Sequence, residues 1–201
     1  MLHNKLLTKE NVDEIFHCFA LRCIENKLNS KIDIYMVGGG AIMLNFDYRL
    51  STIDFDALFV KNDAVNTAID KTAKEKKLPN DWLNQDFVNT PSFSPRITSV
   101  SSLYKVYDNI VYLYTLEPVY LIAMKLKSSR PTGGDLDDVI KMIYELRLNN
   151  VQISYDQIIE AYKNLYTDFS NTYSYFLEKA KLAFEADKEE MEIVLNKRKP
   201  I

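Results

Sequence analysis

Glycine is confined to two short clusters, and this distribution constrains the fold more than any other feature of the chain. All five glycines of the 201 residues lie at positions 38–40 and 133–134, where average usage of about 7% would give roughly fourteen. Glycine permits a positive φ angle and the close approach of a ligand or of another backbone segment. The first cluster follows an apolar, β-branched run at 32–37, which predicts a buried strand that ends at the glycines.

The chain changes character near residue 116. Before this point, segments of alternating polarity lie between segments with apolar residues three and four positions apart. The expected strands are 32–37, 53–60, 81–84, 96–107 and 110–116, and the expected helices are 8–28, 41–46 and 63–76. The later expected helices are 118–128, 135–148, 155–166 and 170–194. We therefore expect an α+β fold, with a mixed sheet and flanking helices in a domain over 1–116 and a C-terminal helical bundle in a domain over 117–201.

Composition excludes several classes of protein. The net charge of −3 provides no global basic field that would recruit nucleic acid. Two cysteines without zinc-type spacing indicate neither a disulfide framework nor a zinc site, and two histidines without a partner motif argue against Ser-His-Asp or Cys-His hydrolysis. No apolar stretch approaches the roughly 20 residues that span a bilayer, and the N-terminus lacks the apolar core of a signal peptide. The expected location is cytoplasmic.

Two aspartates, Asp54 and Asp56, flank Phe55 in the expected strand at 53–60. Alternate side chains of a strand point to the same face, so the two carboxylates project together while Phe55 and Ala57 face the other side. Carboxylates held side by side repel each other unless a cation or a proton lies between them. Magnesium favours such ligands together with substrate phosphates. The pair therefore indicates a metal-binding site or, alternatively, a solvated face of the sheet.

Gly38, Gly39 and Gly40 lie between an expected strand and an expected helix. Successive N–H groups at a helix N-terminus form a concavity that attracts anions. The cluster is not a P-loop, because no Gly-Lys-Ser/Thr sequence follows, and its spacing does not fit the dinucleotide-binding fingerprint. It predicts phosphate binding or, alternatively, only a tight strand-to-helix turn. A strand that carries Asp-x-Asp follows the glycine cluster. Together, the two features favour a nucleotide-binding site at which a divalent metal ion helps to bind the phosphate chain.

These residues together resemble a known signature. A hydrophobic residue, two small residues, a short spacer and then alternating acidic and hydrophobic residues are typical of the DNA polymerase β-type nucleotidyltransferase superfamily. Taking Gly39-Gly40 as the pair leaves thirteen residues before Asp54. The run Arg-x-x-Thr-x-Asp-x-Asp at 49–56 is similar to the bacterial branch that includes AbiEii-type toxins and many uncharacterised relatives. The resemblance covers about residues 32–148, and it includes a Trp-Leu-Asn element at 82–84 and four later residues, Lys125, Arg130, Asp135 and Asp138.

The resemblance implies a nucleotidyltransferase-type mixed sheet and the transfer of a nucleoside monophosphate from an NTP to an acceptor: RNA, a protein or a small molecule. It implies that the glycines at 38–40 bind the triphosphate and that Asp54 and Asp56 are catalytic and ligate two Mg²⁺ ions. Arg49 and Thr52 would support the nucleotide-binding loop, although Thr52 could equally be only the start of a strand. The same branch implies a role in a toxin–antitoxin or abortive-infection module, with an antitoxin as partner.

The sequence departs from the family pattern at one position. Active members usually add a third carboxylate, from a neighbouring strand, that serves as metal ligand and base. The candidates here are Asp86 and Asp81, with Asn84 between them. If Asn84 takes that position, catalysis would be weakened or lost, because an amide cannot serve as a base. The chain would then be a catalytically inactive nucleotide-binding or interaction protein with the same fold.

Lys125 and Arg130 are suited to phosphate, and we take Lys125 as the candidate catalytic cation. Asp135 and Asp138, one helical turn apart, would orient these two cations, or would only complement the macrodipole at the start of the helix at 135–148. We expect Lys125 to point into a cleft lined by the glycine turn and Asp54. Replacing Lys125 with alanine should then weaken NTP binding and leave stability nearly unchanged.

Overall fold

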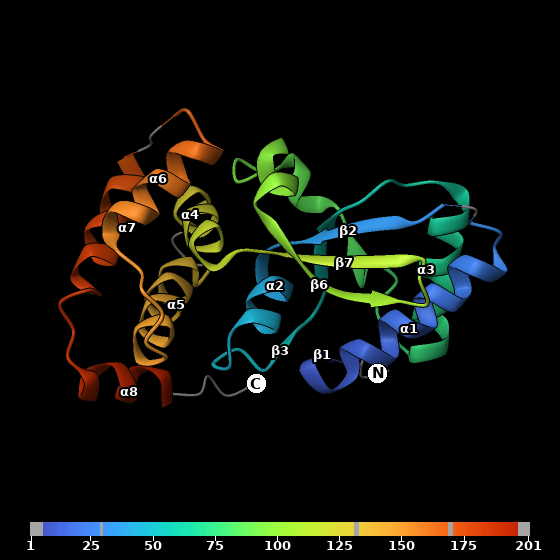
Figure 1. The fold of residues 1–201 in the computed structure, drawn as a ribbon, viewed down its shortest axis with the longest axis horizontal. Helices are drawn as coiled ribbons and strands as arrows, with labels where there is room; N and C mark the ends of the chain where they lie inside the picture. Colours follow the sequence, from blue (N-terminus) through green and yellow to red (C-terminus); the bar gives the residue numbers. More distant parts are fainter. Residues whose placement is uncertain (1–5, 29, 131–132, 169–170, 197–201) are drawn as a thin grey trace. The chain divides into compact units, whose positions relative to one another are not determined.

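The computed structural model describes residues 6–28, 30–130, 133–168 and 171–196. Contacts between residues divide the chain into two compact units (Figure 1). We call the first the sheet unit, and it comprises Met1–Asn45, Leu50–Val88 and Ser101–Leu116. We call the second the helical unit, and it comprises Phe46–Arg49, Asn89–Val100 and Glu117–Ile201. Two short segments that precede residue 116 therefore belong to the helical unit.

Five strands form a mixed sheet in the order β5-β4-β2-β7-β6. These strands are β2 (Ile32–Met36), β4 (Phe55–Leu58), β5 (Leu83–Asn84), β6 (Ser101–Tyr107) and β7 (Val111–Leu116). β2 runs parallel to β7, and β4 runs parallel to β5, while β2 with β4 and β6 with β7 are antiparallel. A separate antiparallel pair joins β1 (Leu7–Thr8) to β3 (Ser51–Thr52). The expected α+β fold with a mixed sheet and later helices is confirmed.

One face of the sheet carries the core of the sheet unit. Alternation along β2 and β4 buries Ile34, Met36, Phe55 and Ala57 on this face. Two helices, α1 (Lys9–Glu25) and α3 (Asp63–Lys76), cover it (Figure 1). Phe16 of α1 stacks on Phe55 with 5.7 Å between the ring centroids. The other face keeps its side chains partly exposed, and Asp54 and Asp56 belong to that face.

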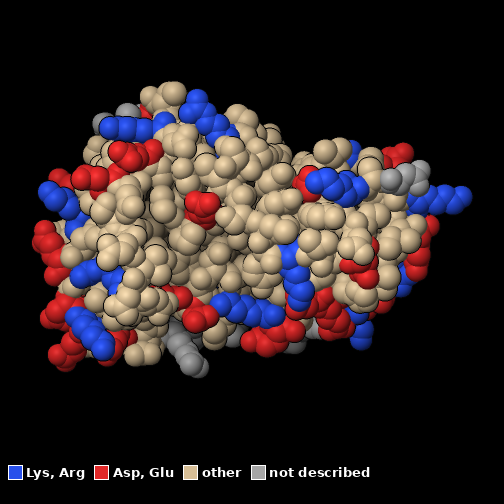
Figure 2. Space-filling view, in the orientation of Figure 1, with Lys and Arg blue, Asp and Glu red and all other residues tan. Residues whose placement is uncertain are grey.

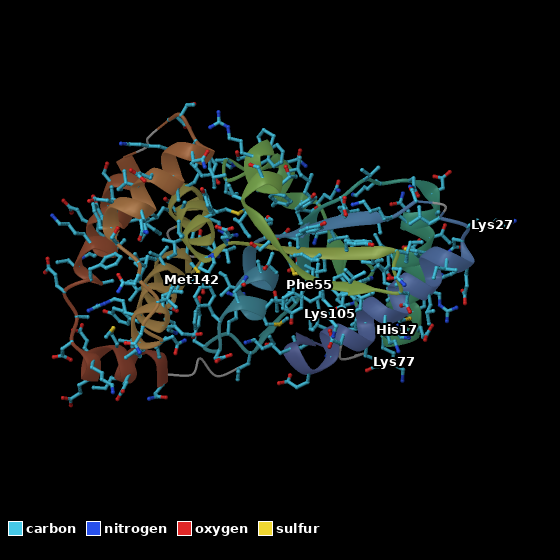
Figure 3. All side chains as sticks on the ribbon, in the orientation of Figure 1. His17, Lys27, Phe55, Lys77, Lys105 and Met142 are labelled. Atoms are coloured by element: carbon cyan, nitrogen blue, oxygen red, sulfur yellow. The ribbon has the colours of Figure 1, made fainter. Side chains whose placement is uncertain are left out.

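The β6 edge of the sheet is tied to α1 by polar contacts. Lys105 (Figure 3) donates to Asp13 Oδ2 at 2.5 Å, and the Tyr107 hydroxyl donates to Asp13 Oδ1 at 2.7 Å. Asp108 and Asn109, with φ angles of 49° and 55°, form the hairpin turn to β7 that the sequence predicts. The expectation that this strand begins at residue 96 is wrong. Residues Pro95–Val100 form the 3-10 helix η2 instead, because Ile97 and Val100, three positions apart, are both buried by that conformation.

Helix α2 (Gly38–Asn45) begins at the first glycine, whereas the sequence predicts a glycine turn followed by a helix at 41–46. A single residue makes the turn, because Gly38 has a φ angle of 58°. Gly40 lies in the first helical turn and is buried against β4 and β2. The remaining 3-10 helix, η1 (Asp86–Asn89), follows β5.

The helical unit contains the helices that follow residue 117. These are α4 (Pro118–Ser128), α5 (Asp135–Leu148), α6 (Tyr155–Leu165), α7 (Asn171–Leu182) and α8 (Lys188–Asn196). Val139, Met142 (Figure 3), Ile143 and Leu146 form the buried stripe of α5. None of the helices in the described ranges is long and apolar enough to cross a membrane. Positive and negative side chains are interspersed on the face shown in Figure 2, in keeping with a net charge of −3.

The expectation of one helix over 170–194 is wrong, because α7 and α8 are separated at 183–187. Arg147 of α5 holds this break by donating to the Ala183 carbonyl at 2.6 Å and to the Ala186 carbonyl at 3.0 Å. Asp187 then accepts a hydrogen bond from the Glu190 amide at 2.9 Å and starts α8. A distant arginine and a local N-cap thus override the continuous helical pattern of the sequence.

We expect Gly40→Ala to destabilise the protein through steric overlap. A Cβ on Gly40 would lie 2.6 Å from Phe55 Cδ1 and 2.7 Å from Met36 Sδ, and both side chains are fully buried. Such overpacking costs about 1–3 kcal/mol, which for a chain of this size lowers the melting temperature by roughly 2–12 °C. Thermal unfolding followed by circular dichroism measures the change. The control Thr67→Ala, on the exposed side of α3, should change the melting temperature little. Equal melting temperatures for Gly40→Ala and the wild type would contradict the close packing.

Candidate functional site

The two aspartates are fixed by the backbone around them. Asp54 directly precedes β4, and the Thr52 hydroxyl donates to its carbonyl at 3.1 Å. Asp56 lies within β4, and its carbonyl accepts a hydrogen bond from the Val37 amide at 2.9 Å. Val37 immediately precedes α2, so the strand pairing brings Asp56 to the start of that helix. Thr52 therefore ends the short strand β3 and also orients the chain at Asp54.

The Asp56 carboxylate packs against the first residue of α2. A Cβ on Gly38 would lie 3.2 Å from Asp56 Oδ2. A side chain at position 38 would therefore crowd the carboxylate. The first amides of a helix have no partner within the helix, and they carry its positive dipole end. The site therefore combines helix amides, which attract anions, with a carboxylate, which attracts cations.

Asn84 takes the position beside Asp54 and Asp56 on the neighbouring strand. It is paired with Asp56 in the parallel register of β4 and β5, and its Nδ2 donates to Asp54 Oδ2 at 3.2 Å. The Asn84 side chain is buried, and its Oδ1 accepts from the Asp86 amide at 2.8 Å. Asp81 and Asp86 are themselves exposed. The neighbouring strand thus supplies an amide, which holds Asp54 in place and cannot accept a proton.

The donor set at this face suits a magnesium ion. Mg²⁺ is usually held by one or two carboxylates and by substrate phosphates, so Asp54 and Asp56 would be its protein ligands. In the part of the chain that the structure describes, no group of three or more Asp, Glu, His or Cys side chains is arranged to hold a metal ion. A bound nucleotide would therefore have to supply the remaining ligands.

Two tyrosines lie on the same face of the sheet as Asp56. Tyr35 of β2 is paired with Leu58 of β4, which places it diagonally from Asp56 on the partly exposed face. Its ring stacks on Tyr114 of β7, with 4.8 Å between the centroids. Tyr112 and Tyr114 alternate with buried residues along β7, and Tyr35 does so along β2; this alternation is the signal that would have shown their common face. Both rings are partly exposed, and a partly exposed flat ring can stack on another flat ring.

A second polar cluster lies within the helical unit, and its centre is Lys125. The Lys125 ammonium lies 2.8 Å from Asp135 Oδ1 and 3.0 Å from Asp138 Oδ2, and all three side chains are buried. Arg130 donates to Asp135 through Nε and a terminal nitrogen, each at 3.0 Å. Arg49 lies 3.2 Å from Asp138 Oδ2. Three cations and two carboxylates make the cluster positive by one charge.

The charges and the burial of the cluster shift the pKa values of two of its groups. Burial raises the pKa of the Asp135 carboxyl, but the hydrogen bonds from Arg130 and the charge of Lys125 outweigh burial and hold that pKa well below its usual range. The Tyr48 hydroxyl donates to Asp138 Oδ1 at 3.3 Å. Burial and the nearby Asp138 charge raise the pKa of the Tyr48 phenol. Asp135 is therefore ionised, and Tyr48 is neutral, at any physiological pH.

Glu145 attaches the segment Phe46–Arg49 to α5. Its Oε1 accepts from the Asp47 amide at 2.7 Å, and its Oε2 accepts from the Tyr48 amide at 3.0 Å. Sequence reasoning missed Glu145 and Tyr48, because their roles depend on backbone that lies about a hundred residues away. The segment that carries Arg49 is thus held by the helical unit, and it lies three residues before Thr52 in the chain.

One of the comparisons with known proteins identifies a family. A family model described as "nucleotidyltransferase of unknown function (DUF6036)" matches residues 19–191. The chain belongs to this nucleotidyltransferase family. Searches of curated proteins and of solved structures give no match. The matched range of the nucleotidyltransferase includes both the Asp54–Asp56 pair and the Lys125 cluster, and the family implies an NTP as substrate.

The structure groups the expected site residues of this nucleotidyltransferase into two sets. The sheet unit holds the glycines at 38–40 with Thr52, Asp54 and Asp56, and the helical unit holds Arg49, Lys125, Arg130, Asp135 and Asp138. Both aspartates of the second set contact Lys125, as the sequence predicts of one or the other. The position of Lys125 relative to the glycine turn and Asp54 stays a prediction.

The burial of Lys125 argues against one expectation about this residue. The sequence predicts that Lys125→Ala leaves stability nearly unchanged, but Lys125 is buried between two buried carboxylates. Removing one partner of a buried ion pair leaves an uncompensated charge. Asp135 and Asp138 continue the buried stripe of α5 at intervals of three and four residues. This spacing places them on the inward face of the helix and could have predicted their burial from the sequence. Lys125→Ala should therefore destabilise the helical unit.

We expect Asp135→Asn to lower stability most strongly at neutral pH. The variant leaves Lys125 buried with less compensation, and loss of such a partner costs about 3–5 kcal/mol. Because the folded state depresses the pKa of Asp135, its carboxylate stabilises the fold above its ordinary pKa of about 4, and this contribution is lost as pH falls through the lower folded pKa.

Urea unfolding of wild type and variant between about pH 2 and pH 7 measures this difference in the free energy of unfolding. It should be greatest near neutral pH and shrink below about pH 4. Glu192→Gln, in the exposed pair with Lys188 on α8, is the control and should have little effect at any pH. A difference that is small at neutral pH, or constant with pH, would contradict the buried ion cluster.

We expect Asn84→Asp to make stability depend on magnesium. The change replaces an amide donor, 3.2 Å from Asp54, with a third carboxylate. Without metal, repulsion and the lost hydrogen bond should lower the free energy of unfolding by about 1–3 kcal/mol. Excess Mg²⁺ should restore much of this loss, because a cation offsets the repulsion. Melting temperatures with EDTA and with MgCl₂ test this, with Asn66→Asp on the exposed side of α3 as the control. A deficit that Mg²⁺ does not change would argue against a metal site at Asp54.

Proposed function

We propose that this protein is a Mg²⁺-dependent nucleotidyltransferase that transfers a nucleoside monophosphate from an NTP to an acceptor. The reaction would occur at the partly exposed face of the sheet unit, beside the start of α2. The contact between Gly38 and the Asp56 carboxylate carries the proposal, because it combines an anion-binding helix terminus with a cation ligand. Membership of the nucleotidyltransferase family supports it.

Each residue of the site has a role in this proposal. The amides of Gly38, Gly39 and Gly40 bind the phosphate chain, and Asp54 and Asp56 hold Mg²⁺. When bound, Mg²⁺ would neutralise charge on the phosphates during an in-line displacement at the α-phosphorus. Thr52 and Asn84 keep Asp54 in position through its carbonyl and its carboxylate.

The acceptor oxygen attacks the α-phosphorus, and the bond from that phosphorus to pyrophosphate breaks. A hydroxyl acceptor must also lose its proton, which normally requires a base within hydrogen-bond reach. Asn84 cannot accept that proton. An acceptor whose oxygen is already ionised, such as a phosphate or a carboxylate, needs no base and fits this site better than a hydroxyl.

The helical-unit cluster contributes positive charge in this proposal. Lys125 is held by Asp135 and Asp138, so its charge is fixed in place, and Arg130 is exposed. The Arg49 Nε is buried and has no hydrogen-bond partner among the described residues, so it is a donor that an anion could satisfy. We propose that these cations bind phosphate, with Asp135 and Asp138 as supporting residues.

Binding of an NTP with Mg²⁺ should stabilise the protein. At a ligand concentration about a hundredfold above the dissociation constant, the gain is about 2.7 kcal/mol, which corresponds to roughly 5–10 °C in melting temperature. Thermal unfolding with each of the four NTPs, with MgCl₂ or with EDTA, measures it. Asp54→Asn should abolish the Mg²⁺-dependent part while the fold persists, and Asp70→Asn, exposed on α3, should retain it. No shift with any NTP would overturn the proposal.

Asn84 favours a second candidate function, a nucleotide-binding protein without catalysis. In that case the same residues bind Mg²⁺ and an NTP, but no base activates an acceptor. Pyrophosphate release separates the two functions. A Mg²⁺-dependent thermal shift without release of pyrophosphate under any acceptor condition would support the binding protein, whereas release that Asp54→Asn abolishes would support the enzyme.

A further inference from the structure

The helical unit holds an open pocket that the proposed reaction does not use. Its volume is about 380 Å³, within the range of small-molecule sites. Three parts of the helical unit line it: the segment 91–96, the last turn of α4, and the residues 165–168 at and after the end of α6. Its side chains include Phe93, Pro95, Arg96, Lys127, Tyr166 and Asp168.

Hydrogen bonds hold the pocket walls together. The Ser94 hydroxyl donates to the Leu165 carbonyl at 3.0 Å, and the Tyr166 hydroxyl donates to the Ser92 carbonyl at 2.6 Å. Arg96 donates through one terminal nitrogen to the Asn164 carbonyl at 2.5 Å. These bonds join the segment before β6 to the end of α6, so the pocket is formed without a ligand.

Lys127 is a cation at the pocket with an unusual environment. Its side chain is only 9% exposed, and its ammonium lies 2.6 Å from Asp168 Oδ2 and 5.4 Å from the centroid of the Tyr166 ring. Asp168 itself is 73% exposed. The hydrogen bond from Lys127 lowers the pKa of the Asp168 carboxyl, so that carboxylate is ionised at neutral pH. A buried cation is thus paired with a hydrated carboxylate that a stronger anion could displace.

The rest of the pocket surface has two further properties. Arg96 is exposed and supplies a second cation, and a guanidinium has five N–H donors in a planar fork that matches phosphate oxygens. Phe93 and Pro95 supply apolar surface against which a flat ring can pack. With Lys127, Arg96 and Asp168 the pocket carries one net positive charge, and displacing Asp168 from Lys127 would leave two cations for a doubly charged group.

We propose that this pocket binds a phosphate monoester that carries a flat ring, with a nucleoside monophosphate as the simplest member of the class. The phosphate takes the place of the Asp168 carboxylate on Lys127 and also accepts from Arg96. The ring packs against Phe93 and Pro95. A phosphate monoester fits better than a carboxylate, because its charge of about −1.5 to −2 at neutral pH matches two cations. This binding requires no catalysis, so the proposal stands or fails independently of the transferase function.

Isothermal titration calorimetry with EDTA tests the proposal, since chelation removes metal-dependent binding at the aspartate pair. The probes are the four nucleoside 5′-monophosphates, the corresponding nucleosides and inorganic phosphate. We expect the monophosphates to bind, inorganic phosphate to bind more weakly, and the nucleosides not to bind. Lys127→Met and Arg96→Gln should each weaken binding by about tenfold or more, as expected for a lost charge-assisted contact.

Asp168→Asn gives the most specific result. Because this exposed change removes the competing carboxylate, it should tighten monophosphate binding several-fold, whereas a residue with only a structural role would not do so. Lys163→Met and Asp156→Asn, both exposed on α6, are matched controls and should leave affinity unchanged. Asp168→Asn decides the matter even if the buried Lys127 cannot be replaced without unfolding.

Three outcomes would overturn the proposal. The first is that no monophosphate binds at millimolar concentration. The second is that Asp168→Asn binds no more tightly than the wild type, or that a folded Lys127→Met binds equally well. The third is that inorganic phosphate or a nucleoside binds as tightly as the monophosphates.

Discussion

The close contact between α2 and β4 is the constraint on which the candidate site depends. Gly40 lets the first turn of α2 pack directly on Phe55 and Met36, where any side chain would overlap them. Gly38 makes the turn with a φ angle of 58° and leaves room for the Asp56 carboxylate. The aspartates, the helix amides and the strand register are therefore consequences of one packing arrangement. A chain without glycine at 38 and 40 could keep Asp-x-Asp and still lose the site.

Buried charge organises the helical unit in a comparable way. Asp135 and Asp138 lie on the inward stripe of α5 and are neutralised by Lys125, Arg130 and Arg49. Glu145, on the same helix, holds Phe46–Arg49 through two backbone amides. Burying charge costs stability unless each group is paired, so such a network specifies one arrangement of its elements. The nucleotidyltransferase family match spans this network and the aspartate pair together.

Local patterns in the sequence predicted most of the elements, because alternation and helical spacing follow directly from which face is buried. The strand at 32–37, the helix at 118–128 and the hairpin turn at Asp108-Asn109 are found close to their expected places. The failures arose where distant residues decide. Arg147 interrupts the helix expected over 170–194, and η2, which packs against α6, replaces the expected start of a strand. The contact of Asn84 with Asp54 depends on strand pairing, which no local pattern reveals.

The central claim is that the face bearing Asp54 and Asp56 directs attack on the α-phosphorus of an NTP. The most direct test is to incubate the protein and Mg²⁺ with each NTP labelled at either the α- or the γ-phosphorus, and with phosphate-, carboxylate- and hydroxyl-bearing acceptors. The account predicts α-label in the acceptor product and γ-label in pyrophosphate, with both lost in Asp54→Asn. Transfer of the γ-label to the acceptor, or α-label transfer that persists in Asp54→Asn, would contradict it.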